Sequence, residues 1–157
     1  MRRSIAAAMF GALLGVGVYT FHYAEGFSYF STDPRACMNC HIMRPQFDSW
    51  QKAGHHDDAT CVDCHLPHSF LLKYLAKGDN GYRHSRGFTL QNFHEPIMIT
   101  ERNSDILQGN CLRCHGALVH GLAAAQGGPG ALRCVHCHAD AGHGERTGLG
   151  GWDKTEF

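Results

Sequence analysis

The sequence predicts a mainly α-helical, loop-rich domain that follows one N-terminal transmembrane helix. Three observations lead to this fold class. An apolar run without formal charge covers residues 4–24, several short segments repeat apolar side chains at helical spacing, and no segment alternates apolar and polar residues as a half-buried strand does. We therefore expect an anchor at residues 1–25 and a second domain at residues 26–157.

The N-terminal segment is long enough to cross a membrane. At about 1.5 Å per residue, a helix over residues 4–24 spans the roughly 30 Å hydrocarbon layer, and aromatic side chains follow it as an interfacial belt does. A cleaved signal peptide is the alternative, although no small-x-small cleavage site follows. We expect an uncleaved anchor in the cytoplasmic membrane. Arg2 and Arg3 would hold the N-terminus in the cytoplasm, which places residues 26–157 on the periplasmic side.

All eight cysteines fall into four copies of the five-residue pattern Cys-x-x-Cys-His. This pattern attaches c-type haem, because the two thiols bind the porphyrin edge and the adjacent imidazole can reach the iron. We therefore expect a multihaem cytochrome c with four covalently bound haems. The attachment cysteines are Cys37 and Cys40, Cys61 and Cys64, Cys111 and Cys114, and Cys134 and Cys137, and the motif histidines are His41, His65, His115 and His138.

Two other uses of paired cysteines are weaker explanations. Four Cys-x-x-Cys pairs could hold two zinc ions in all-thiolate sites, and an even cysteine count in an exported chain can indicate disulfides. Neither explains why a histidine follows the second cysteine in all four copies. The formal net charge is zero and no basic cluster lies beyond the first three residues, so nothing indicates nucleic-acid binding.

The motif spacing indicates two di-haem modules, at about residues 37–65 and 111–138, joined by a connector over residues 66–110. Motif starts lie 24 residues apart in the first module and 23 in the second. We expect short helices over residues 45–54, 69–78 and 100–108, because proline, capping and glycine signals bound them. Glycine and proline predict a loop in residues 121–133.

Axial ligands decide what each haem can do, since an electron-transfer haem takes two strong ligands. Met43 stands two residues after His41, and a thioether is an accepted haem ligand that raises the reduction potential; as an alternative, it fills space in the core. Besides the four motif histidines, nine further histidines stand at positions 22, 55, 56, 68, 84, 94, 120, 136 and 143. About half of them are expected to bind iron.

The sequence resembles the NapC/NirT/NrfH family of membrane-anchored periplasmic quinol dehydrogenases, most closely its NrfH branch of cytochrome c nitrite reductase small subunits. The likeness rests on the single anchor, the four motifs at these spacings, CMNCHIM at residues 37–43, CVDCHLPH at 61–68, ITERN at 99–103 and Asn110-Cys111.

The resemblance implies a set of iron ligands. Met43 would bind haem 1, with His41 displaced from its iron, and His65, His115 and His138 would be proximal ligands of haems 2, 3 and 4. His143 would be the distal ligand of haem 3. For haem 4 the candidates are His55 and His56, and we prefer His55, which directly follows Gly54. A lysine of the catalytic partner would complete haem 2.

The resemblance also implies a quinol pocket beside haem 1 that contains Lys77 and the residue at position 84. Quinol oxidation needs groups that accept two protons, and Lys77, Asp79 and His84 offer them. Some relatives have Asp at position 84, so His84 touches either the iron or only the quinol. The alternative is that Lys73 and Lys77 form the solvated face of an amphipathic helix.

Together these features predict a quinol-oxidising electron-transfer subunit in a hetero-oligomer. Menaquinol from the membrane pool would be oxidised at haem 1, and electrons would pass to the multihaem catalytic subunit of a periplasmic nitrite reductase. One alternative is a NapC-like donor to another periplasmic reductase. Another is a passive wiring cytochrome without a quinol site.

Overall fold

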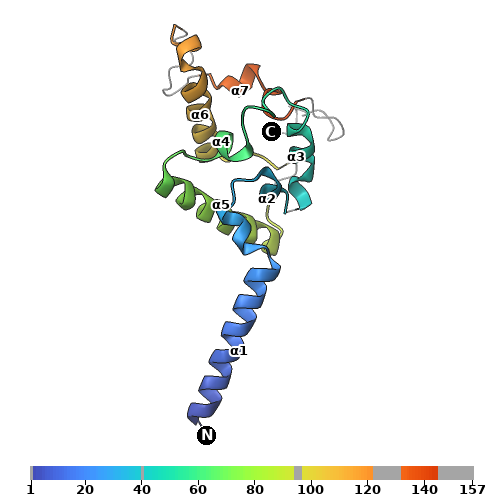
Figure 1. Ribbon diagram of the computed structural model, residues 1–157, viewed down its shortest axis with the longest axis vertical. Coiled ribbons are helices and arrows are strands. Elements are labelled where there is room, and N and C mark those ends of the chain that lie inside the picture. The colour runs from blue at the N-terminus through green and yellow to red at the C-terminus, as the bar shows by residue number, and fades with distance from the viewer. Residues whose placement is uncertain (1, 40, 94–96, 122–131, 145–157) are drawn as a thin grey trace.

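One long helix projects from a small helical domain (Figure 1). The structure is a computed structural model, and it describes residues 2–39, 41–93, 97–121 and 132–144. The projecting helix is α1, Arg2–Tyr23, which buries no residue and is long and apolar enough to cross a membrane. This confirms the expected N-terminal apolar helix. Among the described residues all regular elements are helices, so the mainly α, loop-rich fold class is also confirmed.

The chain turns sharply where α1 ends. Glu25 adopts a left-handed conformation at φ 53°, which stops the helix, and the 3₁₀ helix η1, Gly26–Phe30, follows. Gly26 is buried against the ring of Phe21, and a Cβ at this position would overlap that ring. The Phe21 ring also meets Phe27 edge to face at 5.2 Å. These contacts fix the direction in which the chain leaves the anchor.

Three short helices surround the first motif: α2, Pro34–Met38, the 3₁₀ helix η2, His41–Met43, and α3, Arg44–Trp50. The N-terminus of α2 is capped, because Asp33 Oδ1 accepts a hydrogen bond of 2.8 Å from the Arg35 N–H. The helix predicted over residues 45–54 exists but ends at Trp50. The following turn is held instead by the Trp50 indole, whose Nε1 donates to the Ala59 carbonyl at 3.0 Å.

The second motif forms α4, Cys61–His65, and the long helix α5, Phe70–Leu90, follows it. The prediction that this helix stops at Gly78 was wrong. Glycine lowers helix propensity by only about 1 kcal/mol, and α5 continues because its second half contacts η1 and the start of the next helix. It ends at Gln91, which adopts a left-handed conformation at φ 54°.

The third motif lies within α6, Glu101–Val119, and the fourth within α7, Cys134–Cys137. Thr100 caps α6, since its hydroxyl accepts from the Asn103 N–H, and this confirms the predicted start of a helix at residue 100. The helix runs on beyond Gln108 through the motif itself. Most of the loop predicted over residues 121–133 lies outside the described residues.

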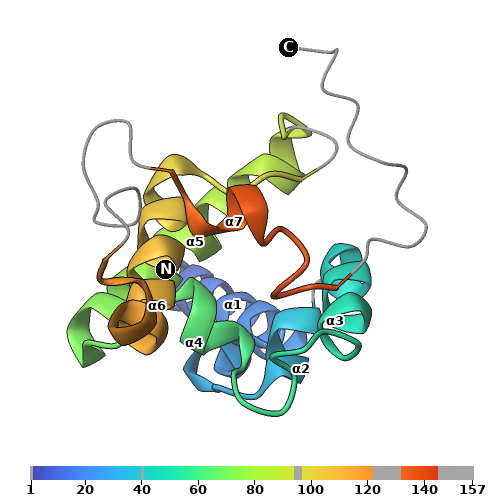
Figure 2. The same ribbon diagram turned by 90° about the horizontal axis from the view of Figure 1, so that it is seen from above.

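The domain is layered above the end of α1, with α5 lowest, α4 over it and α6 and α7 farther out (Figures 1 and 2). Its apolar core is very small. Val62, Leu66 and Ala76 form one buried cluster between α4 and α5, and Ala53 is the one other buried apolar residue in the described part of the chain. A domain of this size needs more buried apolar surface than these four side chains offer, and haem macrocycles would supply it.

Candidate functional site

Helix α6 connects the second and third motifs. Asn110, which directly precedes Cys111, donates from Nδ2 to the Cys64 carbonyl at 2.9 Å and to the Leu66 carbonyl at 3.0 Å. These carbonyls lie at the end of the short helix α4, where helical acceptors lack partners. One side chain therefore fixes two attachment sites relative to each other. This role of Asn110 was not predicted from the sequence, because it depends on a contact with a residue 46 positions away.

The same helix also holds the fourth motif. The Cys134 N–H donates to Gln108 Oε1 at 2.9 Å, which satisfies a free donor at the start of α7. Beside it, Arg133 Nη2 pairs with Asp105 Oδ1 at 2.6 Å. Helix α6 thus carries the third motif and binds the second and fourth motifs through its side chains.

Thiols of consecutive motifs lie next to each other. A hydrogen bond shared with Cys61 lowers the pKa of the Cys37 thiol to about 7, and the same bond raises the pKa of Cys61. Burial raises the pKa of Cys111, which also shares a hydrogen bond with Cys134. Porphyrins attached to such neighbouring thiols would lie side by side, as electron transfer between them requires. No disulfide joins the seven described cysteines.

The second motif is rigidly capped. The Thr60 N–H and hydroxyl both donate to Asp63 Oδ2, at 3.0 and 2.6 Å, which forms a capping box inside the motif. These bonds lower the pKa of the Asp63 carboxyl. Burial lowers the pKa of His65 to about 4, so its imidazole stays neutral and keeps a nitrogen lone pair for a metal.

A cavity of about 440 Å³ lies between α4 and α6 and is lined by two motifs and one candidate distal ligand. Its walls include the second cysteine of motif two and both cysteines and the histidine of motif three, together with His55. This volume falls in the range of cofactor and ligand pockets. Residues of the second and third motifs that are expected to attach and bind haem thus gather around one space.

Two of the candidate distal histidines are oriented as metal ligands usually are. His55 Nδ1 lies 2.9 Å from the Ala141 carbonyl, and His143 Nδ1 lies 3.0 Å from the Gln46 carbonyl. A backbone carbonyl at Nδ1 fixes the tautomer and leaves Nε2 available to a metal. His56 differs, because its Nδ1 pairs with Asp57 and its ring packs on Trp50 with centroids 4.6 Å apart. The geometry therefore favours His55 over His56.

Each of these histidines also lies near a motif histidine. The ring centroids of His55 and His115 are 5.9 Å apart, and those of His65 and His143 are 6.0 Å apart. The resemblance implied other partners, with His143 opposite His115 and His55 opposite His138. The structure thus brings the expected residues to the attachment sites, but its ring contacts follow a different pairing.

The first motif is described in part. Met43 is half-buried and occupies the N-cap position of α3, so its thioether lies close in sequence and space to the first attachment site. Cys40 and the side chain of His41 lie outside the described residues. His138 follows the end of α7 and is exposed.

Lys77 joins α5 to the juxtamembrane segment. Its Nζ donates to the Tyr29 carbonyl at 2.7 Å and to the Ser31 carbonyl at 2.6 Å, and it lies 5.8 Å from the centroid of the Tyr74 ring. Burial lowers the pKa of Lys77, while the nearby Cys37 opposes this shift. Lys77, the candidate quinol-site residue on α5, therefore lies between the anchor and the first expected haem attachment site.

His84 and Asp79 have different surroundings. His84 follows Lys77 by seven residues, two helical turns, and thus shares its face of α5; burial lowers the pKa of His84. Asp79 lies on another side of the helix, where it accepts from Arg83 Nε at 3.1 Å and from Arg102 Nη1 at 2.8 Å. The structure therefore groups Lys77 with His84 and directs Asp79 toward α6.

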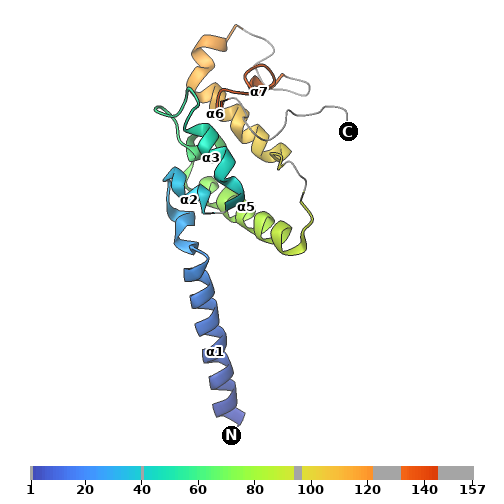
Figure 3. The same cartoon turned by 90° about the vertical axis from the view of Figure 1, so that its right-hand side faces the viewer.

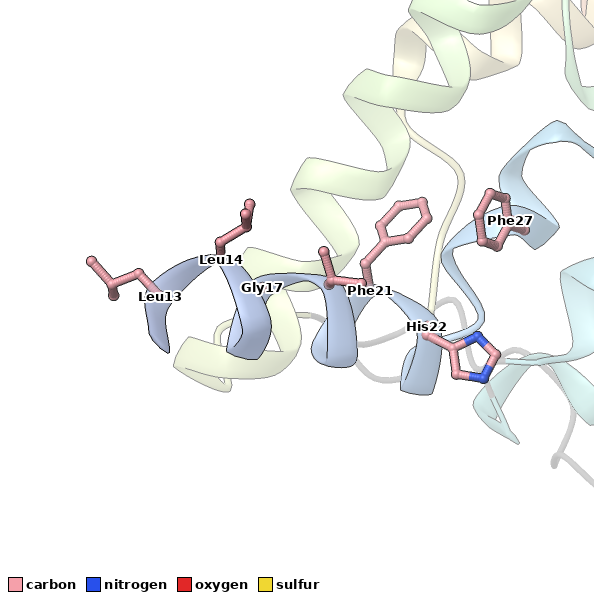
Figure 4. A pocket seen from close by; sticks show the side chains of 7 residues that line it. Leu13, Leu14, Gly17, Phe21, His22 and Phe27 are labelled. Atoms are coloured by element: carbon pink, nitrogen blue, oxygen red, sulfur yellow. The ribbon is translucent and has the colours of Figure 1, made fainter. Parts of the chain in front are cut away.

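A second cavity, of about 560 Å³, lies along the outer end of α1 (Figure 4). Its lining is apolar apart from the imidazole of His22, and it consists of Leu13, Leu14, Gly17, Val18, Phe21, His22 and Phe27. In the view of Figure 4 the leucines and the two phenylalanines project from α1 and η1. This space lies between α1 and η1, and its lining does not include Lys77 or His84.

The arrangement fits haem better than the alternatives weighed from the sequence. The motif thiols, the two carbonyl-anchored imidazoles and the cavity between α4 and α6 suit covalent haem with axial nitrogen ligands. A structural zinc site needs four clustered ligands. Within residues 2–39, 41–93, 97–121 and 132–144, no group of three or more His, Cys, Asp or Glu side chains could hold a metal ion.

Comparison with known proteins agrees with this chemistry. The model of the NapC/NirT cytochrome c family, N-terminal region, matches residues 1–105. The cytochrome c-type protein NrfH of Wolinella succinogenes is 36% identical over 90% of this chain and 85% of its own length. The cytochrome c nitrite reductase subunit NrfH of Nitratidesulfovibrio vulgaris is 32% identical over 85% of this chain and 80% of its own length.

A solved structure is also similar. One chain in a crystal structure of the cytochrome c nitrite reductase NrfHA complex, bound to the HQNO inhibitor, superposes with a TM-score of 0.63 at 28% identity, covering 87% of this chain and 90% of that chain. Together with the apolar helix α1, these matches indicate a single-pass membrane protein that carries haem c. The chain belongs to the NapC/NirT cytochrome c family.

Proposed function

We propose that this protein is a membrane-anchored quinol dehydrogenase that oxidises menaquinol and passes the electrons through four c-type haems to the catalytic subunit of a periplasmic cytochrome c nitrite reductase. The observation that carries the proposal is the grouping of Lys77 and His84 on the face of α5 that lies beside Cys37 and the end of the anchor. The matches to NrfH subunits and to the NrfHA complex support the choice of partner.

Lys77 and His84 would handle the protons. A quinol releases two protons with its two electrons, so its site needs bases that are unprotonated before the reaction. Burial lowers the pKa of both side chains, which favours their neutral, proton-accepting forms. Asp79, held by Arg83 and Arg102, would act as a positioning residue that keeps this part of α5 against α6.

The haems, when bound, supply one-electron redox chemistry, and the chain supplies their spacing and ligands. We assign attachment to the four cysteine pairs, with Met43 as the ligand of haem 1 and His65, His115 and His138 as proximal ligands of the others. His55 and His143 are the two further histidine ligands, as their carbonyl-anchored Nδ1 atoms support. A lysine of the catalytic partner would complete haem 2.

The proposed topology follows from the charges at the N-terminus. Arg2 and Arg3 would keep that end in the cytoplasm, and the haem domain would face the periplasm, where the catalytic subunit binds it in a hetero-oligomer.

Quinol-driven haem reduction in lipid nanodiscs tests the quinol site. We expect His84→Gln and Lys77→Arg to slow reduction by menaquinol by about a hundredfold, the lower end of the range for general acid–base catalysis. Arginine keeps the donors that reach Tyr29 and Ser31 but cannot give up its proton. Dithionite reduction should be unchanged in both variants. Lys73→Arg, on the same helix, is the control.

Two results would contradict the proposal. Unchanged menaquinol rates in both variants would refute this quinol site, since electrons would then enter without Lys77 or His84. A solubilised pull-down through this subunit should recover a protein that reduces nitrite. Recovery of a reductase without nitrite activity would indicate a NapC-like donor to another enzyme.

A further inference from the structure

Helix α5 carries an apolar stripe that no other described element covers. The stripe consists of Leu71, Leu75 and Tyr82, which are 66%, 56% and 68% exposed. Spacings of four and seven residues place the three side chains on one face of the helix. Exposed apolar side chains are common one at a time, but a continuous row of them on one helix indicates a surface that something covers.

The stripe faces away from the haem domain. Ala76, 2% exposed, packs with Val62 and Leu66 of α4, so it marks the inner face of α5. On a flank of that face Asp79 and Asn80 bind the start of α6: Asn103 Nδ2 donates to Asn80 Oδ1 at 2.9 Å, beside the pair between Arg102 and Asp79.

The remaining flank of α5 contacts the end of the anchor. The rings of Tyr74 and Phe30 lie 6.0 Å apart, Lys77 holds the Tyr29 and Ser31 carbonyls, and a Cβ on Gly81 would lie 2.7 Å from Tyr29 Cε1. With both of these sides occupied, the stripe looks outward, away from α4. Helix α5 crosses the end of α1 (Figures 1 and 3), and α4 lies on the opposite side of α5 from α1 (Figure 1). The stripe is therefore on the side from which α1 departs.

The contacts with η1 also fix the height of α5. Tyr23, Phe27 and Phe30 are exposed at the end of α1 and form an aromatic belt, which in membrane proteins lies at the level of the lipid headgroups. Because α5 touches Phe30 and the Tyr29 backbone directly, it lies at the same level. The stripe thus lies on a helix whose neighbouring flank contacts the end of the anchor.

We propose that α5 lies flat on the outer leaflet, with Leu71, Leu75 and Tyr82 inserted among the lipids. An amphipathic helix bound this way buries its apolar face about 5–10 Å below the headgroups. Arg86 follows Tyr82 by one turn at the edge of the stripe, where its guanidinium can meet lipid phosphates. This contact, in addition to α1, fixes the tilt of the haem domain over the membrane.

The orientation has a consequence for quinol access. Lys77 and His84 lie on the flank of α5 next to η1, so in this orientation they stand at headgroup level beside the bilayer. A quinol headgroup would then reach them by a short sideways step while its tail stays in the lipid. The membrane contact itself does not depend on quinol chemistry, and it is tested separately.

Cysteine labelling in nanodiscs tests the membrane contact. Leu71→Cys, Leu75→Cys and Tyr82→Cys are introduced one at a time into the full haem-loaded chain, with haem content checked by mass. The nanodiscs contain anionic phospholipid, and the reagent is a charged maleimide that does not enter bilayers. We expect each stripe cysteine to react at least about tenfold more slowly than Leu118→Cys, because lipid excludes the reagent. Leu118, on α6, is 81% exposed and serves as the matched control.

Two outcomes would overturn the proposal. Stripe cysteines that react as fast as Leu118→Cys would show that the stripe faces water. Slow reaction that appears only after the catalytic partner is added would show that a protein covers the stripe. Three positions are used so that one poorly folded variant does not decide the result. A cytochrome without quinol activity but with protected stripe cysteines would refute the proposed function alone.

Discussion

Asn110 and Cys64 are joined by a hydrogen bond of 2.9 Å, from the amide Nδ2 just before the third motif to a carbonyl inside the second. The two residues are 46 positions apart. Because the same amide also holds Leu66, it closes α4 at its C-terminal end and sets the distance between two attachment sites. This neutral side chain thus helps to set the relative placement of the second and third motifs.

Replacing this amide should loosen the link between α4 and α6. We expect Asn110→Ala to lower the free energy of unfolding by about 1–3 kcal/mol, because two partly buried carbonyls lose their donor. Urea unfolding of the holoprotein measures the change. Asn92→Ala, at an exposed position just past the end of α5, should change stability by less than about 0.5 kcal/mol. Equal effects of the two variants would contradict this role of Asn110.

The two adjacent histidines before the second motif should differ in their effect on haem spectra. We expect His55→Ala to convert one haem to a high-spin form, because an iron loses its sixth ligand. His56→Ala should leave the spectrum unchanged, since its imidazole is engaged with Asp57 and Trp50. Optical and EPR spectra of preparations with equal haem content make the comparison. A high-spin signal from the His56 variant alone would reverse the assignment.

Two glycines of α5 should respond oppositely to alanine. At Gly78 an added Cβ meets nothing within 4 Å, so Gly78→Ala should raise the free energy of unfolding by about 0.5–1 kcal/mol through helix propensity. At Gly81 the Cβ would meet the Tyr29 ring at 2.7 Å, so the ring must move and Gly81→Ala should gain less or lose stability. Thermal unfolding in matched detergent measures both, and equal gains would show that Tyr29 does not pack on Gly81.

The capping box formed by Thr60 and Asp63 should make a pH-dependent contribution to the free energy of unfolding. Hydrogen bonds from Thr60 lower the pKa of Asp63 in the folded state, so its stabilisation is present above the unfolded value of about 3.8 and is lost as pH falls through the lower folded value. We expect Asp63→Ala to cost about 1 kcal/mol at pH 7, as loss of a cap does. Unfolding of both proteins from pH 7 downward should show the difference shrinking below about pH 4. A difference independent of pH would contradict this role.

Local patterns in the sequence were sufficient for several features. The uncharged run identified the helix Arg2–Tyr23, and the capping signal at Thr100 identified the start of α6. The Cys-x-x-Cys-His spacing in the same way predicts the attachment residues. Each depends on residues that lie within a few turns of one another. Such patterns are visible in a single sequence, because the physics that produces them acts over the same short range.

Other features were decided by contacts between distant parts of the chain. The sequence predicted that α5 ends at Gly78, yet the helix continues because Tyr29 and Arg102 contact its second half. Asp79 was grouped with Lys77 by proximity in sequence, but helical geometry and two arginines direct it elsewhere. His55 and His56 differ only in what lies across the fold, the Ala141 carbonyl for one and Trp50 for the other. The sequence by itself predicts which groups attach haem, and it determined where the apolar N-terminal helix lies. The tertiary structure alone decided which groups orient the candidate ligands, because a histidine and the carbonyl that holds it are up to 97 residues apart in the sequence.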